Sequence, residues 1–366
     1  TTVTALDVLG KDFQFQTTLS YDGVVEKGIL KGNLYVKGGF DPEFMELDMD
    51  FLVRAVKEAG IQAISGKLVG DVSLMDSIYW GEGWSWDDTP EAFQPYLSPL
   101  MLNRGCVDIK VSPSSKGKVG VVEIIPESDY YQLNNRSISL YPEAGKLKIT
   151  RDWLTDGNTI DVSGSVSSVR KRTLNLYDSK QFFMDTFCYK LKKEGLSVSK
   201  DSIFFLTTPD TVQWIYTCRR PVEAVLKRAL KESDNLSAEA LFRQLGRMNG
   251  KHTSHISFKD CQGVVEGFMR NTLGYDSENY QIVDGSGVSL YNYVSPRLVL
   301  AYLNYAYRHP SLFRVFYDCL PVAGVDGTLQ GRMRTGKAFR NVRAKTGTVT
   351  GCLLYTSPSP RDSTSS

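Results

Sequence analysis

The sequence is poor in the residues that build metal centres and lacks the long apolar runs that span membranes. Its 366 residues include three histidines and six cysteines. No two cysteines stand at the spacing of a zinc knuckle, so neither a metal site nor a disulfide framework is indicated, and no cofactor is implied. No apolar run approaches the roughly 18 residues of a membrane-spanning helix, so no transmembrane segment is expected.

An excess of either charge is also missing. The 43 Lys and Arg against 41 Asp and Glu leave a net charge of +2. Nucleic acids and anionic membranes attract clustered basic residues, so neither is an expected partner. An apolar share of 42% and a charged share of 23% are typical of a globular protein. The length is that of roughly two to three domains.

Both ends of the chain are unusual. Val3, Leu6 and Leu9 recur at helical spacing before Gly10, a residue suited to a left-handed helix cap, which predicts a helix whose first part is missing. Segment 352–366 resembles a translated sequencing adapter and is expected to be foreign to the fold; the alternative is a natural Ser/Pro-rich tail. We therefore expect truncation at both ends, which leaves the question of a signal peptide open.

Hydrophobic periodicity divides the rest of the chain. Strand-like runs fill the first third, interrupted by a predicted helix at about 45–60 that is followed by a strand at 68–72. Short alternating strands with turn signals predict a small β-rich unit at about 107–176. Amphipathic helices are predicted from about residue 222. An aromatic cluster at 80–96 is explained equally by packing between domains or by contact with a substrate.

Two short motifs in the helical half carry the candidate chemistry. They are Ser233-Asp234-Asn235 and Lys345-Thr346-Gly347. Each is weak alone, and a second S-x-N at 277–279 is interpreted as chance. The simpler interpretations are a helix N-cap for the first motif and a strand running into a turn for the second.

In this order the two motifs form two thirds of the active-site signature of penicillin-binding proteins and serine β-lactamases. The missing third is S-x-x-K at the start of a buried helix. It has three matches, at Ser115/Lys118, Ser168/Lys171 and Ser197/Lys200. All lie in polar stretches, whereas the chemistry needs the hydroxyl and a desolvated amine one helical turn apart, so we reject all three.

Longer segments make the resemblance specific. In the second half they are SDNLSAEA at 233–240, DGSGVS at 284–289, NYVSP at 292–296, LPVAGVDGTL at 320–329 and AKTGT at 344–348, and in the first half GNLYV at 32–36, GFDP at 39–42 and GWSWDD at 83–88. Over residues 1–351 the chain resembles the low-molecular-mass class C penicillin-binding proteins. These are the D-alanyl-D-alanine carboxypeptidase/endopeptidases of peptidase family S13.

The resemblance implies an α+β fold, with a transpeptidase domain like that of the penicillin-binding proteins and serine β-lactamases, whose helices pack on an antiparallel sheet. A large β-rich insertion interrupts this domain. The expected division is a catalytic domain of 1–18 and 212–351 and an insertion of 19–211, itself divided into one unit of 19–106 and 177–211 and an inner unit of 107–176.

The resemblance also implies roles for individual residues. A nucleophilic Ser and its Lys would precede Thr1 in the pattern S-x-x-K-x-x-Thr1. Ser233 would relay a proton, Asn235 would orient the substrate amide, and Lys345 would recognise the terminal carboxylate. The expected substrate-binding residues are Asp234, Thr346, Gly347, Thr348, Asp88, Phe93, Leu290 and Thr350. Four of these residues, Asp88, Phe93, Leu290 and Thr350, would form a side pocket for the third residue of the stem peptide. In this pocket Leu290 replaces the Arg of other members.

The expected partners are a peptidoglycan stem peptide ending in D-Ala-D-Ala and β-lactam inhibitors, and the expected location is the periplasm after export. Two alternatives remain open. One is a serine β-lactamase or esterase of the same superfamily, which the large inserted block disfavours. The other is a catalytically inactive peptidoglycan-binding or structural protein.

Overall fold

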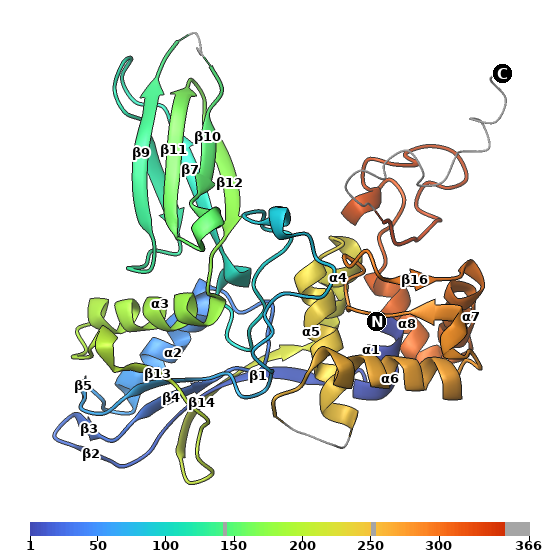
Figure 1. Cartoon of the computed structure of the whole chain (residues 1–366), viewed down its shortest axis with the longest axis horizontal. Coiled ribbons are helices and arrows are strands. Elements are labelled where there is room, and N and C mark those ends of the chain that lie inside the picture. Colours follow the sequence, from blue (N-terminus) through green and yellow to red (C-terminus); the bar gives the residue numbers. More distant parts are fainter. Residues whose placement is uncertain (142–144, 250–253, 348–366) are drawn as a thin grey trace.

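The computed structural model describes residues 1–141, 145–249 and 254–347. The segment 352–366, expected to be foreign, lies outside the described residues. Mixed helices and sheets confirm the α+β class, and they form a part rich in strands and a part rich in helices (Figure 1).

A five-stranded mixed sheet lies at the base of the strand-rich part. Its order is β13-β6-β4-β1-β14, with β1 antiparallel to both of its neighbours and β4, β6 and β13 parallel. The strands are β1 (Gln14–Tyr21), β4 (Leu34–Lys37), β6 (Leu68–Asp71), β13 (Ile203–Phe205) and β14 (Gln213–Pro221), and the helices α2 (Glu46–Glu58) and α3 (Ser179–Lys193) pack beside them. The helix predicted at 45–60 and the strand predicted at 68–72 are thus confirmed. A small sheet of β2 (Val24–Glu26), β3 (Ile29–Lys31) and β5 (Ala63–Ile64) adjoins.

Two three-stranded sheets form the unit that stands above α3 in Figure 1. One contains β7 (Cys106–Ser112), β8 (Val121–Ile125) and β12 (Arg170–Asn175), and the other contains β9 (Gln132–Ser139), β10 (Lys148–Arg151) and β11 (Thr159–Val166). Buried valines and isoleucines on alternating positions, such as Ile109 and Val111, join the two sheets into one core. The strand content predicted for 107–176 is therefore present.

The helical part gathers elements from both ends of the sequence. It contains α1 (Thr2–Leu9), α4 (Val222–Lys231), α5 (Asn235–Gly246), α6 (Phe258–Asn271), α7 (Pro296–Arg308), α8 (Pro310–Cys319) and the short pair β15 (Tyr280–Gln281) and β16 (Tyr293–Val294). Helix α1 packs against α5 and α8 (Figure 1). Gly10 ends α1 with φ 81° and ψ 159°, so the left-handed cap expected there is wrong, although the positive φ still favours glycine.

The buried apolar side chains form two clusters. One joins the sheets with α2 and α3, and the other joins α1 with α4–α8. The expected domain boundary between residues 18 and 19 falls inside β1, whose pairing with β14 links the two parts. The domain division itself stays a prediction.

The chain between residues 72 and 99, named the 72–99 segment below, runs between the two parts (Figure 1). Leu74, Met75, Trp84 and Leu97 from this segment belong to the helical cluster. Arg151 on β10 ties the segment to the β-rich unit: it is 2% exposed and donates to the Thr89 hydroxyl at 3.0 Å and the Tyr96 hydroxyl at 3.3 Å.

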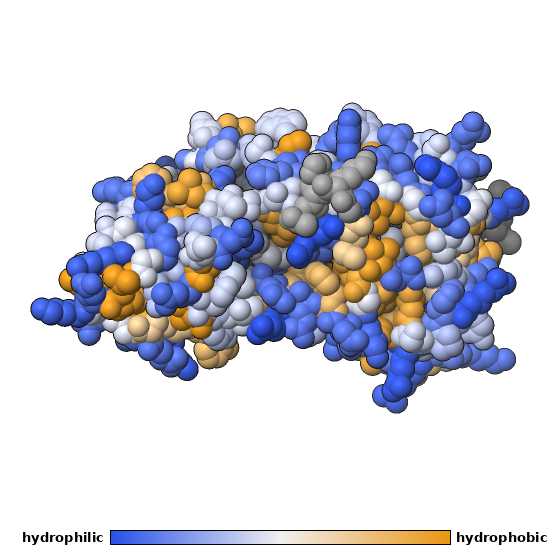
Figure 2. Space-filling model, turned by 90° about the horizontal axis from the view of Figure 1, so that it is seen from below, coloured by the Kyte–Doolittle hydropathy of each residue, from blue (hydrophilic) through white to orange (hydrophobic). Residues whose placement is uncertain are grey.

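The surface is mostly hydrophilic on the face shown in Figure 2, with apolar residues gathered in a band over the helical part. Among the exposed apolar side chains are Val299, Leu300, Leu303 and Tyr307 of α7. No helix within the described ranges is long and apolar enough to cross a membrane. The five described cysteines are buried free thiols.

Arg151→Ala is expected to lower the free energy of unfolding by about 3 kcal/mol, because it leaves several buried acceptors without a donor. These acceptors include the Asn175 carbonyl, 2.8 Å from Nε, and the Gly157 carbonyl, 2.8 Å from a terminal guanidinium nitrogen. Arg136→Ala is the matched control, because Arg136 is largely exposed and its ion pair with Asp161 is a surface pair worth less than about 1 kcal/mol. Urea unfolding of both variants measures the difference; equal losses would contradict the assignment.

Candidate functional site

The two motifs meet in one cavity. It has a volume of about 310 Å³ and is lined by Ser85, Asp88, Phe93, Ser233, Asn235, Ser286, Gly287, Val288, Leu290, Lys345, Thr346 and Gly347. Three stretches that are far apart in the sequence supply most of this wall: the 72–99 segment, the start of α5 and the loop before β16. Eight of the residues predicted from the sequence line it: Ser233, Asn235, Lys345, Thr346, Gly347, Asp88, Phe93 and Leu290.

The closest contact between the motifs joins Lys345 to Ser233. The Lys345 Nζ donates to the Ser233 Oγ at 2.6 Å and to the Thr346 carbonyl at 2.5 Å. Partial loss of water around the ammonium lowers the pKa of Lys345. A hydroxyl and an amine of lowered pKa within hydrogen-bond distance can exchange a proton, which is the chemistry required of a relay.

Residues 344–347 carry no regular secondary structure, so the strand expected for the second motif is not present among them. A single bridge between Val322 and Arg343 precedes them. A strand needs a hydrogen-bonded partner over several residues, and the described neighbours of the motif supply one bridge. The Thr346 hydroxyl donates to the Thr328 hydroxyl at 2.9 Å, which fixes the motif to the loop at 327–329 instead.

Helix α5 begins at the first motif. Asp234 is its N-cap and accepts a hydrogen bond from the Ser237 N–H at 2.8 Å. Ser233, just before the cap, has φ 57°, a left-handed conformation that is uncommon for a residue other than glycine and is typical of functional sites. The simpler interpretation of this motif as a helix N-cap is therefore confirmed, and it holds Ser233 and Asn235 at the cavity wall.

Asp234 is not among the residues that line the cavity. Its side chain pairs with Arg104, which also contacts Glu43 at 3.1 Å. Burial raises the pKa of Asp234, but the hydrogen bond and charge of Arg104 outweigh it, so the pKa lies below the ordinary value. The described geometry gives Asp234 a capping contact, and its predicted contact with substrate stays a prediction.

Asn235 is oriented by the 72–99 segment. Its side-chain N–H donates to the Phe93 carbonyl at 3.0 Å, which uses one of its two N–H groups. Phe93 is 46% exposed and Leu290 is 69% exposed, so both present apolar surface to the cavity. Burial, and then the charges of Asp87 and Glu91, raise the pKa of Asp88.

Two buried carboxylates that the motif analysis did not single out hold the loop opposite Lys345. Glu239 on α5 accepts the Gly285 N–H at 3.0 Å and the Ser286 N–H at 2.7 Å, while its second oxygen has no partner. Asp284 accepts the Trp84 indole N–H at 2.8 Å. A side chain at Gly285 would collide with Phe242, so glycine is required for this close approach. The signal available in the sequence was an acidic residue in the second turn of a helix facing a D-G-S-G loop.

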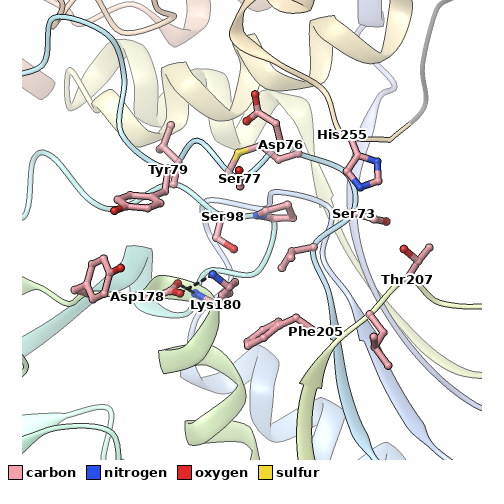
Figure 3. Close-up of a pocket in the computed structure, with 16 residues that line it drawn as sticks. Ser73, Asp76, Ser77, Tyr79, Ser98, Asp178, Lys180, Phe205, Thr207 and His255 are labelled. Atoms are coloured by element: carbon pink, nitrogen blue, oxygen red, sulfur yellow. Dashed lines mark hydrogen bonds and ion pairs between the residues drawn. The ribbon is translucent and has the colours of Figure 1, made fainter. Parts of the chain in front are cut away.

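Two residues predicted for the site remain. Thr348 and Thr350 are outside the described residues. No cluster of three or more metal-binding side chains occurs in the described ranges. A second cavity of about 450 Å³ contains Asp178, Lys180 and His255 and none of the residues predicted for the site (Figure 3).

Comparisons with known proteins agree on one family. The sequence model of the D-Ala-D-Ala carboxypeptidase 3 (S13) family matches residues 1–354. The chain is 27% identical to D-alanyl-D-alanine carboxypeptidase DacB of Haemophilus influenzae, over 96% of this chain and 74% of that protein. It is 28% identical to a D-alanyl-D-alanine carboxypeptidase of an Actinomadura species, over 96% and 67%.

Solved structures agree with the sequence comparisons. The crystal structure of penicillin binding protein 4 (dacB) from Haemophilus influenzae matches with a TM-score of 0.82 and 25% identity, over 96% of this chain and 78% of that one. A second crystal structure of that protein, complexed with a β-lactam, has the same fold at a TM-score of 0.73. The predicted penicillin-binding fold is confirmed.

Glu239 makes stability depend on pH. Burial, and to a smaller extent Asp284, raise its pKa to about 7. The Glu239 carboxyl therefore binds a proton more tightly in the folded chain than in the unfolded chain, where the pKa of a Glu is about 4.3. The protonated Glu239 contributes its full stabilisation to the folded chain below about pH 4.3, and this contribution declines as pH rises to about 7. Thermal melts across this range are expected to show a smaller decline in Glu239→Gln than in the unaltered chain; the decline that remains comes from carboxyls such as Asp41, whose pKa burial raises to about 6.

Glu239→Ala is the companion variant, because it removes the acceptor of two buried N–H groups. It is expected to cost about 1–3 kcal/mol across the whole pH range. Identical pH dependence in the unaltered chain and Glu239→Gln would show that Glu239 does not titrate in this window.

Proposed function

The chain belongs to the D-Ala-D-Ala carboxypeptidase 3 (S13) family of hydrolases, and on this premise we propose that it cleaves the D-Ala-D-Ala end of peptidoglycan stem peptides through an acyl-enzyme. The observation that carries the proposal is the 2.6 Å hydrogen bond that brings Lys345 to Ser233 across a cavity. The S13 match over residues 1–354 favours this function over a β-lactamase or esterase of the same superfamily.

In this proposal the nucleophilic Ser and its Lys precede Thr1. None of the three S-x-x-K matches within the chain lines the cavity. The Thr1 hydroxyl donates to the Gly285 carbonyl at 2.6 Å, and Gly285 adjoins the cavity residue Ser286. This contact places Thr1 close to the cavity residues, which supports a nucleophile near Ser233 and Lys345 if S-x-x-K precedes Thr1 as the family resemblance implies.

In this proposal each residue of the two motifs has its own role. Lys345 supplies the positive charge that binds the terminal carboxylate, and the Thr346 hydroxyl adds a hydrogen-bonding group beside it. Ser233, already hydrogen-bonded to Lys345, passes a proton to the departing D-alanine nitrogen. Asn235 orients the backbone amide of the stem peptide. Thr348 would offer its backbone N–H to the oxyanion.

The proposed activity also implies the partners of the protein and its location in the cell. A cavity that recognises an acyl-D-Ala-D-Ala end also accepts β-lactams, as the Haemophilus influenzae relative does in its complex. Peptidoglycan lies outside the cytoplasmic membrane, so the protein would act after export, in the periplasm. The domain division predicted from the sequence belongs to this proposal, with the catalytic domain assembled from 1–18 and 212–351.

Fluorescent penicillin tests the proposed activity. A chain extended upstream past the expected S-x-x-K is expected to be labelled covalently, while residues 1–366 alone are expected to stay unlabelled if the nucleophile precedes Thr1 as proposed. In the extended chain, Ser233→Ala and Lys345→Ala are each expected to slow acylation by about a hundredfold or more. Ser277→Ala, in the S-x-N sequence outside the cavity, is the matched control and should acylate normally.

Failure of the extended chain to label would refute the enzyme and leave an inactive peptidoglycan-binding protein as the remaining interpretation. Equal acylation by Ser233→Ala and Ser277→Ala would refute the role of Ser233 alone.

Leu290 tests the side pocket proposed for the third residue of the stem peptide. Asp88 can pair with an ammonium there, but Leu290 offers no partner to a carboxylate. In the extended chain, Leu290→Arg is expected to raise kcat/KM for diaminopimelate-containing peptides about tenfold, through a charge-assisted hydrogen bond. Leu290→Met and lysine-containing peptides are the controls. An unchanged rate for Leu290→Arg would show that Leu290 lies outside the substrate pocket.

A further inference from the structure

An aromatic cavity lies beside the motif cavity and shares a turn with it. Its volume is about 300 Å³, and its walls are Tyr79, Trp80, Trp86, Thr89, Tyr96, Trp153, Leu154 and Asp156. The 3₁₀ turn η1 (Trp86–Asp88) presents Trp86 to this cavity and Asp88 to the motif cavity. A substrate that fills one cavity therefore has its neighbouring chemical groups close to the other.

The wall of this cavity exposes aromatic surface that packing does not account for. Trp86 is 66% exposed and Leu154 is 72% exposed. The Trp86 and Trp153 rings lie 5.2 Å apart at an angle of 38° and form an open platform. Behind it, Trp80 and Tyr96 contact each other with ring centroids 5.2 Å apart, so the platform rests on a packed aromatic layer.

Polar and charged groups at the cavity select the kind of ligand. None of the residues that line it is Lys or Arg, and Asp156 places a carboxylate at its edge. Asp87 is exposed on the same turn as Trp86. The guanidinium of Arg151 lies behind Thr89 and Tyr96 but is 2% exposed and donates to both, so the lining offers no free cation to an anionic polymer. A neutral ligand with O–H and N–H donors can hydrogen-bond to Asp156.

We propose that this cavity binds an N-acetylated amino-sugar ring of the glycan strand whose stem peptide occupies the motif cavity. The C–H face of a sugar ring is apolar and carries slight positive charge, so it stacks on the negative face of an indole. Its hydroxyl and acetamido groups supply donors to Asp156. The identity of the sugar rests on the proposed function, because the peptide and the glycan are parts of one substrate.

Tyr79 extends this cavity toward a third one. Its ring lines both the aromatic cavity and the cavity of Figure 3, where it lies at the end opposite His255 and Thr207. The 72–99 segment thus supplies wall residues to all three cavities.

Direct binding to the chain tests the proposal. The probe is the β-1,4-linked trimer of N-acetylglucosamine, and maltotriose, which lacks acetamido groups, is the control sugar. Saturation-transfer NMR and calorimetry are expected to detect the trimer and not maltotriose. Trp86→Ala and Trp153→Ala are each expected to weaken binding about tenfold or more. Trp214→Ala, which removes an indole that is 60% exposed on β14, is the matched control and should bind as the unaltered chain does.

The outcomes separate the two proposals. No binding of the trimer, or equal binding by Trp86→Ala, Trp153→Ala and Trp214→Ala, overturns the sugar site even where penicillin labels the extended chain. Trp86 is largely exposed, so loss of binding in Trp86→Ala with an unchanged melting temperature cannot come from unfolding. Trimer binding without penicillin labelling refutes the proposed peptidase and retains the sugar site. Quenching of Trp86 by apolar peptides and not by the trimer overturns the site in favour of a protein partner.

Discussion

The buried carboxylate of Asp284 is the contact on which the candidate site depends. It accepts hydrogen bonds from the Trp84 indole, from the backbone N–H of Gly287 and Ser289, and from the Asn292 amide, all at 2.7–2.8 Å. A buried carboxylate is tolerated where its lone pairs are satisfied in this way. Because one donor comes from the 72–99 segment and the others from the loop at 284–292, this single side chain fixes two walls of the cavity relative to each other.

Recognition in the proposed site is local. The sequence is nearly neutral overall, and the positive charge at the cavity comes from Lys345, held by Ser233 on one side and by its own chain on the other. A substrate carboxylate has to compete with these internal acceptors for the ammonium. The site therefore selects substrates whose carboxylate can replace these two hydrogen bonds of Lys345 in the right geometry, and it does not depend on a broad electrostatic field.

Much of this arrangement could be predicted from the sequence, for identifiable reasons. Hydrophobic patterning located α2, which buries one face, and β6, which is buried throughout, and the two motifs predicted that Ser233 and Lys345 belong to one site. Motif spacing does not specify where a side chain points, so the cap that Asp234 forms on α5 and its pair with Arg104 were visible only in the structure. The sequence shows Glu239 only as an acidic residue near the start of a helix, because its contact with the loop depends on residues about 45 positions further along the chain. The strand expected at Lys345 depends on partner strands, which local sequence does not reveal.

The position of the 72–99 segment has a thermodynamic consequence. Its side chains belong to the helical cluster, while Arg151 ties it to the β-rich unit. A ligand that binds against this segment is bound only when both parts of the chain are folded around it. Binding free energy is then shared by the two cores, and the melting of either core releases the ligand. An occupied cavity thus strengthens the coupling between the two hydrophobic cores.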